Sequence, residues 1–427
     1  MKTFLTVLAT CAMAVAGDWP RFRGPNGSGI SDATAIPTSW TESDYAWKAK
    51  LPAAGHSSPV IVGNRLFVTC ADKDGGRQIV LGLDAATGKI LWQREFPFKP
   101  YRQNKDNSFA SATPAADSAG VVVTWSTPQQ VVLLALDNAG REVWRRDFGP
   151  FIAAHGNGSS PIIAGGLVIF DNNQEDPAAN PASYKQPDSP KEAGSSFVVA
   201  VDRKTGKTRW QLDRTTGLAA YATPCVRDNR EVIVCNTKHG ITGIDLFTGK
   251  VNWEIPVFDR RVVSSPVLHG ELVLNGCGSG GAGSGYFAVK AKKAELVYTI
   301  EKPVPYVPTA LVKDDFLFLW GDNGTVTCAD ARSGKVIWRE RIQGAFYSSP
   351  VCAGGCLYNI TRSGDVIVIA AADKFQLMAR IPLGEPSHAS AAIAGGTLYL
   401  RTLTQVFAVR RKYRAHRLAK GLLYGTT

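Results

Sequence analysis

The stretch 83–92, LDAATGKILW, decides the fold, because the chain repeats its pattern four more times. In each copy an apolar run ends on Asp, turns through Gly, and resumes with a basic residue and an aromatic one. The pattern is typical of a β-hairpin in which the Asp carboxylate accepts the free N–H groups of the turn and Gly88 adopts a positive φ. The other copies are LDNAGREVW (136–144), VDRKTGKTRW (201–210), IDLFTGKVNW (244–253) and ADARSGKVIW (329–338).

The aromatic residue of each copy sets the period of the repeat. Successive steps of 52, 66, 43, 45 and 40 residues separate Trp92, Trp144, Trp210, Trp253, Tyr298 and Trp338. A period of about 40 to 50 residues with four short strands is typical of propeller blades or of a solenoid. One aromatic at the same place in every repeat predicts a wedge between neighbouring sheets rather than a platform for bases, so we expect no nucleic-acid partner.

A second landmark recurs in phase with the first. It is a short apolar strand, a turn with Gly or Asp, and a second apolar strand with period-2 alternation. Several copies open on Ser-Ser-Pro, which suits a strand start because Pro loses no ladder hydrogen bond there. The eight starts are Ser57, Ser111, Ser159, Ala222, Ser264, Pro308, Ser348 and Ser390.

The last repeat lacks a strand, and the beginning of the chain offers one. Seven starts are followed by a second hairpin, whereas the eighth reaches only QVFAV (405–409). The stretch SDYAWKAKL (43–51) holds Trp47, 45 residues before Trp92. Pairing it into the last blade would close the ring and remove both exposed sheet edges. The sequence therefore predicts an all-β fold, an eight-bladed β-propeller of four-stranded antiparallel blades over residues 43–409.

The two ends of the chain differ from the repeats. Residues 1–16 have the basic start, apolar middle and small-residue end of a secretory signal, and the apolar part is too short to span a membrane. Soluble export is favoured over a lipid anchor, because Thr precedes Cys11 in a poor lipid-attachment box. Residues 17–42 are expected to be an ordered arm that packs on the propeller through Trp19 and Phe22.

The tail 410–427 carries six Lys or Arg and no acidic residue, and it accounts for much of the net charge of +12. A solvated end is the favoured interpretation. The alternative is contact with anionic surface polymers or membrane, and we expect no other membrane contact.

At the arm, WPRFRGPNGSG (19–29), and at the repeated hairpins, the chain resembles the quinoprotein-type (PQQ-like) β-propeller repeat family. More narrowly, it resembles exported proteins of this type from bacteria such as planctomycetes, which end near LGEPSHASAAIAGGTLYLRT (383–402). The resemblance covers nearly the whole mature chain. The family includes alcohol and sugar dehydrogenases and also the non-catalytic propeller lipoprotein of the outer-membrane β-barrel assembly machinery, so the resemblance implies the fold more strongly than an activity.

The dehydrogenase branch of the family implies PQQ and Ca²⁺ in the funnel, held by carboxylate and amide ligands, with a base Asp and often a vicinal Cys-Cys disulfide. This chain has no Cys-Cys pair, and most of its acidic residues are the hairpin Asp residues. We therefore expect no cofactor, with PQQ and Ca²⁺ as the less favoured alternative. Cys352 and Cys356 flank Ala-Gly-Gly, and a disulfide between them and two small buried side chains are equal alternatives.

Three segments are expected to emerge on one face of the propeller. Residues 97–110 lengthen the link from the first blade to the second, and residues 171–196 separate the second and third strands of the third blade. NGCGSGGAGSGY (275–286) is interpreted as a third, mobile connection. Loops on a rigid scaffold are where binding tends to occur.

The residue three before each strand-entry Pro, or its equivalent, is expected to ring the central funnel on this face. These positions are His56, Ser111, Gly158, Tyr221, Val263, Val307, Tyr347 and His388. Ring closure would make the blades of His56 and His388 neighbours, with Tyr347 beside them. Two His without a third ligand favour a polar lining over a metal site.

The candidate binding residues are thus His56, Tyr221, Arg261, Tyr347 and His388, without a catalytic group or a metal. Arg261 is expected to offer a cation for a carboxylate or phosphate, and imidazoles with a pKa near 6.5 would make binding depend on pH in mild acid. The predicted function is an exported, non-catalytic scaffold at the cell envelope, in a periplasmic or extracellular location. Its partner would be another envelope protein or a small polar or sugar-like ligand, and the chain is expected to be a monomer. The alternative is a quinone-dependent dehydrogenase or a carbohydrate-active enzyme that uses the funnel.

Overall fold

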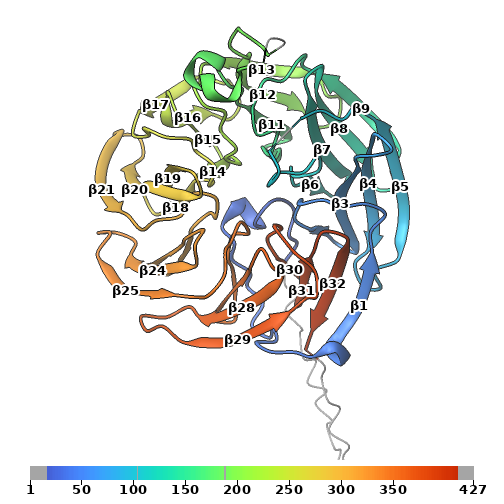
Figure 1. Cartoon of the computed structure of the whole chain (residues 1–427), viewed down its shortest axis with the longest axis vertical. Helices are drawn as coiled ribbons and strands as arrows, with labels where there is room; N and C mark the ends of the chain where they lie inside the picture. The colour runs from blue at the N-terminus through green and yellow to red at the C-terminus, as the bar shows by residue number, and fades with distance from the viewer. Residues whose placement is uncertain (1–16, 103, 187–188, 412–427) are drawn as a thin grey trace, which may run out of the picture.

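The computed structural model describes residues 17–102, 104–186 and 189–411, and its strands form eight four-stranded antiparallel sheets around a central axis (Figure 1). Each sheet is one blade, and its shortest strand lies nearest the axis. The prediction of an eight-bladed propeller is confirmed, as are all eight of the predicted strand starts. The predicted signal, residues 1–16, and most of the basic tail, residues 412–427, lie outside the described residues.

The first four blades follow one another in chain order, each from its innermost to its outermost strand. Blade one comprises β2 (Val60–Val62), β3 (Arg65–Asp72), β4 (Arg77–Asp84) and β5 (Ile90–Pro97). Blade two comprises β6 (Ala115–Asp117), β7 (Gly120–Thr127), β8 (Gln130–Asp137) and β9 (Glu142–Asp147). Blade three comprises β10 (Ile162–Ala164), β11 (Leu167–Asn172), β12 (Ser196–Asp202) and β13 (Thr208–Arg214). Blade four comprises β14 (Cys225–Arg227), β15 (Glu231–Asn236), β16 (Gly240–Asp245) and β17 (Val251–Ile255).

The second half repeats this order, except that the last blade takes its outer strand from the start of the chain. Blade five comprises β18 (Val267–His269), β19 (Leu272–Ser279), β20 (Ala282–Lys290) and β21 (Glu295–Glu301). Blade six comprises β22 (Leu311–Lys313), β23 (Phe316–Trp320), β24 (Thr325–Asp330) and β25 (Val336–Arg341). Blade seven comprises β26 (Val351–Ala353), β27 (Cys356–Ile360), β28 (Asp365–Ala370) and β29 (Leu377–Pro382). Blade eight comprises β30 (Ala392–Ala394), β31 (Thr397–Arg401), β32 (Gln405–Arg410) and β1 (Tyr45–Lys50).

The repeated Asp-to-Gly turns form as the sequence predicts. Asp84 Oδ1 accepts hydrogen bonds from the backbone N–H groups of Ala86 (3.0 Å) and Thr87 (2.9 Å), and Gly88 has a φ of 73°. Bonds from the Thr87 hydroxyl and these N–H groups hold the pKa of Asp84 below its ordinary value. The turn carboxylates are thereby occupied. The same capping recurs at Asp137, Asp202, Asp245 and Asp330.

At six of the eight junctions between blades, the repeated aromatic side chain donates a hydrogen bond to the turn of the next blade. Trp210 Nε1 donates to the backbone carbonyl of Leu246 in the turn of blade four at 2.9 Å. The Trp210 ring also lies so close to Gly249 that a Cβ at this glycine would stand 2.7 Å from the ring. The aromatic is therefore a wedge, and the absence of a side chain at Gly249 leaves room for it. Equivalent hydrogen bonds run from Trp47 to Ala85, Trp92 to Asn138, Trp144 to Arg203, Tyr298 to Ala331 and Trp338 to Ala372.

Blade eight closes the ring in the predicted way. β1 pairs with β32 in antiparallel register, with Trp47 opposite Ala408. Trp47 Nε1 then donates to the Ala85 carbonyl of blade one at 3.1 Å, so the last blade is joined to the first by the same contact that joins the others. β32 extends to Arg410, one residue beyond the predicted end of the propeller.

The N-terminal arm crosses one end of the central channel. Trp19 pairs with Ile61 of blade one, Asn26 exchanges hydrogen bonds with Val226 of blade four, and the backbone of Gly29 accepts from Cys352 of blade seven. Trp19 is 1% exposed, which confirms the predicted packing. Figure 1 shows the arm's 3₁₀ turn η1 (Pro25–Gly27) at the centre of the ring, so the arm covers this end of the channel.

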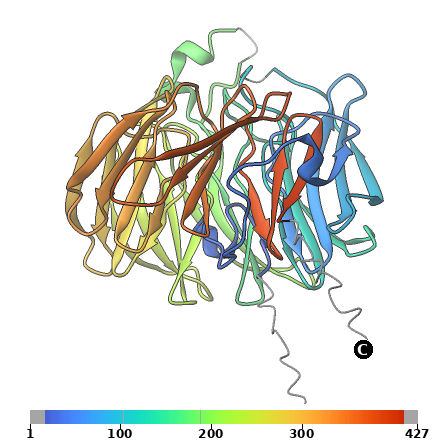
Figure 2. The ribbon, with the colours of Figure 1, turned by 90° about the horizontal axis from the view of Figure 1, so that it is seen from below.

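The insertions lie at the other end. The 171–196 insertion carries η3 (Pro177–Ala179) and η4 (Pro181–Ser183), which project from the end opposite η1 (Figure 2). Together with η1 and η2 (Glu42–Asp44), η3 and η4 are the 3₁₀ turns of the described residues. None of the helices in the described residues is long and apolar enough to cross a membrane. The interpretation of residues 275–286 as a loose connection is wrong, because β19 and β20 pair through Ser279 and Ala282 and leave only a Gly-Gly turn.

The structure favours buried free thiols over a disulfide for the cysteines. The seven described cysteines are free and buried. Cys352 lies opposite Leu357 and Cys356 opposite Ala353, so the two side chains are not cross-strand partners. The buried alternative therefore holds for this pair in the structure.

The hydrogen bond of the aromatic wedge leads to a prediction on stability. Trp210 and Trp253 are 8% and 6% exposed, but Trp253 Nε1 has no partner among the described residues, and the turn of blade five lacks glycine. Trp210→Phe should therefore lower the free energy of unfolding by about 1 kcal/mol more than Trp253→Phe, since only the first leaves a carbonyl unsatisfied. Urea unfolding of the two variants measures the difference, and equal losses would contradict this role for the hydrogen bond.

Ring closure leads to a second prediction. A chain that starts at residue 43 loses the arm but keeps β1, whereas a chain that starts at residue 51 exposes the edge of β32. We expect the first to unfold cooperatively at a lower Tm and the second to aggregate or lose cooperative unfolding. Calorimetry and gel filtration of the two truncated chains test this. A soluble, cooperatively folding chain from residue 51 would show that β1 is dispensable for closure.

Candidate functional site

A central cavity of 440 Å³ opens at the loop-bearing end of the channel. Its volume falls within the range of pockets that hold small molecules, about 300–1,000 Å³. All eight positions that the sequence places around the funnel line it. Phe22 of the arm also lines the cavity, which is therefore bounded on the side of the arm.

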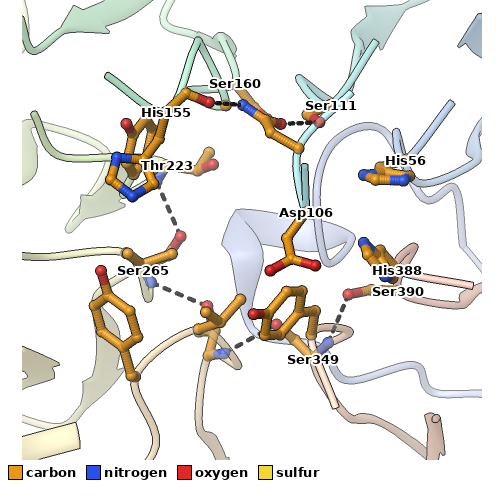
Figure 3. Close-up of a pocket in the computed structure, with 18 of the residues that line it drawn as sticks. His56, Asp106, Ser111, His155, Ser160, Thr223, Ser265, Ser349, His388 and Ser390 are labelled. Carbon is orange, nitrogen blue, oxygen red and sulfur yellow. Dashed lines mark hydrogen bonds between the residues drawn. The ribbon is translucent and has the colours of Figure 1, made fainter. Parts of the chain in front are cut away.

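A ring of hydroxyl groups surrounds the cavity where the innermost strands begin. In seven of the eight links, a backbone N–H of one blade donates to the Ser or Thr hydroxyl oxygen of the next, as in Ser58 to Thr113 (2.9 Å) and Ser390 to Ser58 (3.0 Å). These bonds join the blade entries, and Figure 3 shows several of them. The ring consists of Ser58, Thr113, Ser160, Thr223, Ser265, Thr309, Ser349 and Ser390, and all eight line the cavity.

Ring closure brings three of the predicted residues together on one wall. The His56 and His388 rings lie 4.2 Å apart between centroids, and Tyr347 meets His388 edge-on at 5.2 Å. The expectation of imidazole pKa values near 6.5 is wrong. Burial, reinforced by the positive charge of neighbouring groups, lowers the pKa of His56 to about 3 and that of His388 to about 4. Both rings are therefore neutral in mild acid.

The sequence reasoning missed an ion pair on this wall. Asp106, in the loop that links blades one and two, reaches across the cavity to the guanidinium of Arg362 in blade seven. The Arg362 guanidinium lies 4.3 Å from the centre of the Tyr347 ring, and its Nε donates to His388 Nε2 at 3.4 Å. Figure 3 shows Asp106 near the middle of the cavity, toward His388. The loop is thus fastened to blade seven, which only blade eight separates from blade one.

The facing wall holds a second ion pair, formed by the long insertion. Arg261 Nη2 donates to Glu175 Oε1 at 2.7 Å, and the Tyr184 hydroxyl donates to Glu175 Oε2 at 2.8 Å. Burial alone raises the pKa of Glu175, but Arg261 and the hydrogen bonds outweigh it and hold the pKa below its ordinary value. Arg261 also contacts Tyr221, which lines the cavity as predicted. Arg261 is therefore not the free cation that the sequence suggested.

The sequence partly indicated Asp106 and Glu175, two of the residues that the prediction missed. Asp106 and Glu175 belong to the two insertions that interrupt the period, so the segments were recognisable. Their partners were not, because a loop without periodicity does not indicate which blade it will contact. Arg362 follows β27 in an ordinary turn and stands out only through its contact with Asp106.

The fold and the cavity together define a quinoprotein-like β-propeller, a class that includes both enzymes and binding proteins. The family model described as outer membrane protein assembly factor BamB matches residues 41–97, 76–299 and 301–413. The chain belongs to this family. A relative, outer membrane protein assembly factor BamB of Burkholderia pseudomallei (strain K96243), is 23% identical over 399 residues, which cover 88% of this chain and 91% of that protein.

Solved structures of an outer membrane assembly factor and of dehydrogenases share the fold. BamB from Moraxella catarrhalis has a TM-score of 0.60 and 17% identity, and the match covers 86% of this chain and 98% of that one. Quinohemoprotein alcohol dehydrogenase from Comamonas testosteroni has a TM-score of 0.69 and 14% identity, with coverages of 96% and 83%. A europium-containing methanol dehydrogenase has a TM-score of 0.66 and 14% identity, with coverages of 91% and 90%. At these identities the likeness concerns the fold alone.

The dehydrogenase-like fold raises the question of a quinone and a metal, and the donors of this cavity do not fit them. PQQ is a polycarboxylate and needs free cations, but Arg362 and Arg261 are each paired with a carboxylate. Ca²⁺ needs several converging oxygen ligands. The Glu175 side chain is 0% exposed, and no three His, Cys, Asp or Glu side chains gather as metal ligands within residues 17–102, 104–186 and 189–411.

The low imidazole pKa values predict how stability depends on pH. The unfolded chain binds protons on His56 and His388 near pH 6.5, whereas the folded chain excludes them until about pH 3 to 4. Their contribution to stability is complete above pH 6.5 and is lost as the pH falls toward 4. In the double variant His56→Gln/His388→Gln, the free energy of unfolding should fall less steeply over this window.

The slope of the unfolding free energy against pH should be smaller in the double variant by at most about 1.4 kcal/mol per pH unit for each imidazole. The change in slope should be smaller where water reaches the rings. Urea titrations of wild type and double variant from pH 4 to 7.5 provide the measurement. Other titrating groups contribute equally to both proteins and cancel. Parallel profiles would mean that these imidazoles titrate normally in the folded state.

Proposed function

We propose that this chain is an exported, non-catalytic propeller that acts as a binding scaffold of the cell envelope, and that it binds at the end where the cavity opens. The family description and the Burkholderia relative both name an outer membrane assembly factor, which supports a location in the envelope and a role in contacts with other molecules. The signal-like residues 1–16 support export. The basic tail, 410–427, is the segment available for contact with an anionic membrane.

The observation that carries the proposal is that the two ion pairs at the cavity, Asp106 with Arg362 and Glu175 with Arg261, occupy both of the arginines on its walls. A general base must hold a proton-accepting atom against the substrate with a pKa near the working pH. Asp106 is neutralised by Arg362, and Glu175 is sealed beneath Arg261. The pKa of His56 and of His388 is too low for either ring to retain a proton near neutrality. The site is organised for polar recognition rather than for proton transfer.

The loops support a binding role for the same end. The described parts of the 98–110 and 173–195 segments stand at the mouth of the cavity, and an ion pair fastens each to another part of the ring, Asp106 to Arg362 or Glu175 to Arg261. Loops fixed in this way present a defined surface at little entropic cost on binding.

The rival function is a quinone-dependent dehydrogenase, and a direct test separates the two. The protein is dialysed against PQQ and Ca²⁺, and reduction of an electron-accepting dye is followed with alcohols and aldoses. We expect no stoichiometric uptake of PQQ and no quinone-dependent dye reduction, because the cations of the cavity are already paired. Uptake of one equivalent together with turnover would overturn the proposal.

The position of the binding surface is tested by photo-crosslinking within the cell envelope. A photoreactive residue replaces Asn104 at the cavity or, as a matched control, Phe247 in the turn of blade four at the opposite end. Both sites are accessible, with Phe247 52% exposed. We expect specific crosslinks from position 104 and none from position 247. The reverse pattern would show that the wrong end of the propeller has been assigned.

A further inference from the structure

Two ion pairs flank the cavity, and the imidazole pair on its wall is neutral. Asp106 is balanced by Arg362 and Glu175 by Arg261, and burial lowers the pKa of His56 and of His388. At these walls a charged ligand would enter a partly desolvated site without a free counter-ion, or would have to displace one partner of an ion pair. Either event is unfavourable. The electrostatics of these walls therefore favour a ligand without net charge.

The cavity nevertheless offers many hydrogen-bonding groups. Seven of the eight hydroxyl oxygens of the ring accept a hydrogen bond from a backbone N–H. None of the eight hydroxyl groups donates its own proton to an acceptor among the described residues. His155 Nδ1 is buried against the cavity and also has no partner in the described part of the chain. A ligand that fills the site must therefore present both acceptors and donors.

Aromatic rings add apolar surface between these polar groups. Tyr347 lies beside the imidazole pair on one wall, Tyr221 lies on the facing wall, Tyr306 lines the cavity between them, and Phe22 lies on the side closed by the arm. The combination is a neutral cavity of 440 Å³ with ring faces, hydroxyl donors and imidazole nitrogens. A sugar matches it, because each sugar hydroxyl both donates and accepts while the C–H faces of the ring are apolar.

We infer that the cavity binds an uncharged saccharide of one or two rings, held as a ligand between the Tyr347 and Tyr221 walls. The inference rests on the proposed non-catalytic binding function and specifies the ligand of the same site. Asp106 would accept hydrogen bonds from sugar hydroxyls near the middle of the cavity, and the hydroxyl ring would donate to sugar oxygens. A peptide segment is the alternative occupant, and the test below separates it from a sugar.

The experiment uses the mature chain, residues 17–427, and isothermal titration with neutral methyl glycosides of glucose, galactose, mannose and xylose and with cellobiose and maltose. We expect saturable, one-to-one binding of at least one neutral probe. Its charged counterparts, such as methyl glucuronide against methyl glucoside, should bind at least ten-fold more weakly. Equal or tighter binding of the charged counterpart, or binding of none of the neutral probes, would overturn the inference.

Three variants locate the site. Tyr347→Ala should weaken binding of the neutral probe at least ten-fold, and Phe247→Ala, on the far turn of blade four, should leave it unchanged. Asp106→Asn preserves shape but leaves Arg362 unpaired, so it should improve binding of the uronide at least ten-fold over wild type. A merely structural role for Asp106 would not reverse the charge preference. A neutral probe that binds equally to wild type and Tyr347→Ala would place the sugar elsewhere and overturn the assignment.

The outcomes also separate this inference from the proposed function. If no sugar binds and crosslinks from position 104 identify a peptide segment in the cavity, the ligand class is wrong and the scaffold function stands. If a sugar binds and is oxidised in the presence of PQQ and Ca²⁺, the ligand class holds and the non-catalytic function is wrong.

Discussion

The contact between one aromatic side chain and the turn of the next blade underlies the whole structure. A four-stranded blade buries only part of its apolar surface by itself, and its neighbours must cover the rest. The wedge, seen in Trp210 against Gly249, sets the distance and angle at which they do so. Glycine at position 249 leaves room for the ring, because a Cβ there would stand 2.7 Å from it. Trp47 makes the same contact from blade eight to blade one, so closure relies on no separate device.

The cavity depends on that closure. His56 and His388 belong to the first and last blades and become neighbours only when β1 completes blade eight. The two insertions then bring Asp106 to Arg362 of blade seven and Glu175 to Arg261 in the link between blades four and five. The result is a site in which these two arginines are paired with carboxylates of the protein. Its remaining hydrogen-bonding capacity lies in hydroxyls and neutral imidazoles, which suits recognition of a neutral polar molecule.

The candidate site could be predicted from the sequence where the repeat itself placed residues. Tyr347, His388 and His56 stand at equivalent positions before a strand entry, so the phase of the repeat was enough to place them on the funnel. Arg362 and Asp106 were not predictable, since their contact joins the link between blades one and two to a turn of blade seven, far along the chain. The predicted pKa values of His56 and His388 were also wrong, because the burial of a ring depends on the groups packed around it and not on its neighbours in sequence.

The sequence by itself determined the number of blades, their hairpins, the wedges and the closing strand, because each is a local pattern that recurs with a fixed period. A hairpin needs only its own turn residues and alternation, and a wedge needs only the turn of the following repeat. Only the tertiary structure decided that the arm covers one end of the channel, that Arg261 is neutralised by Glu175, and that His56 and His388 are uncharged. These features arise from desolvation and from contacts across the ring, which exist only after the blades have packed.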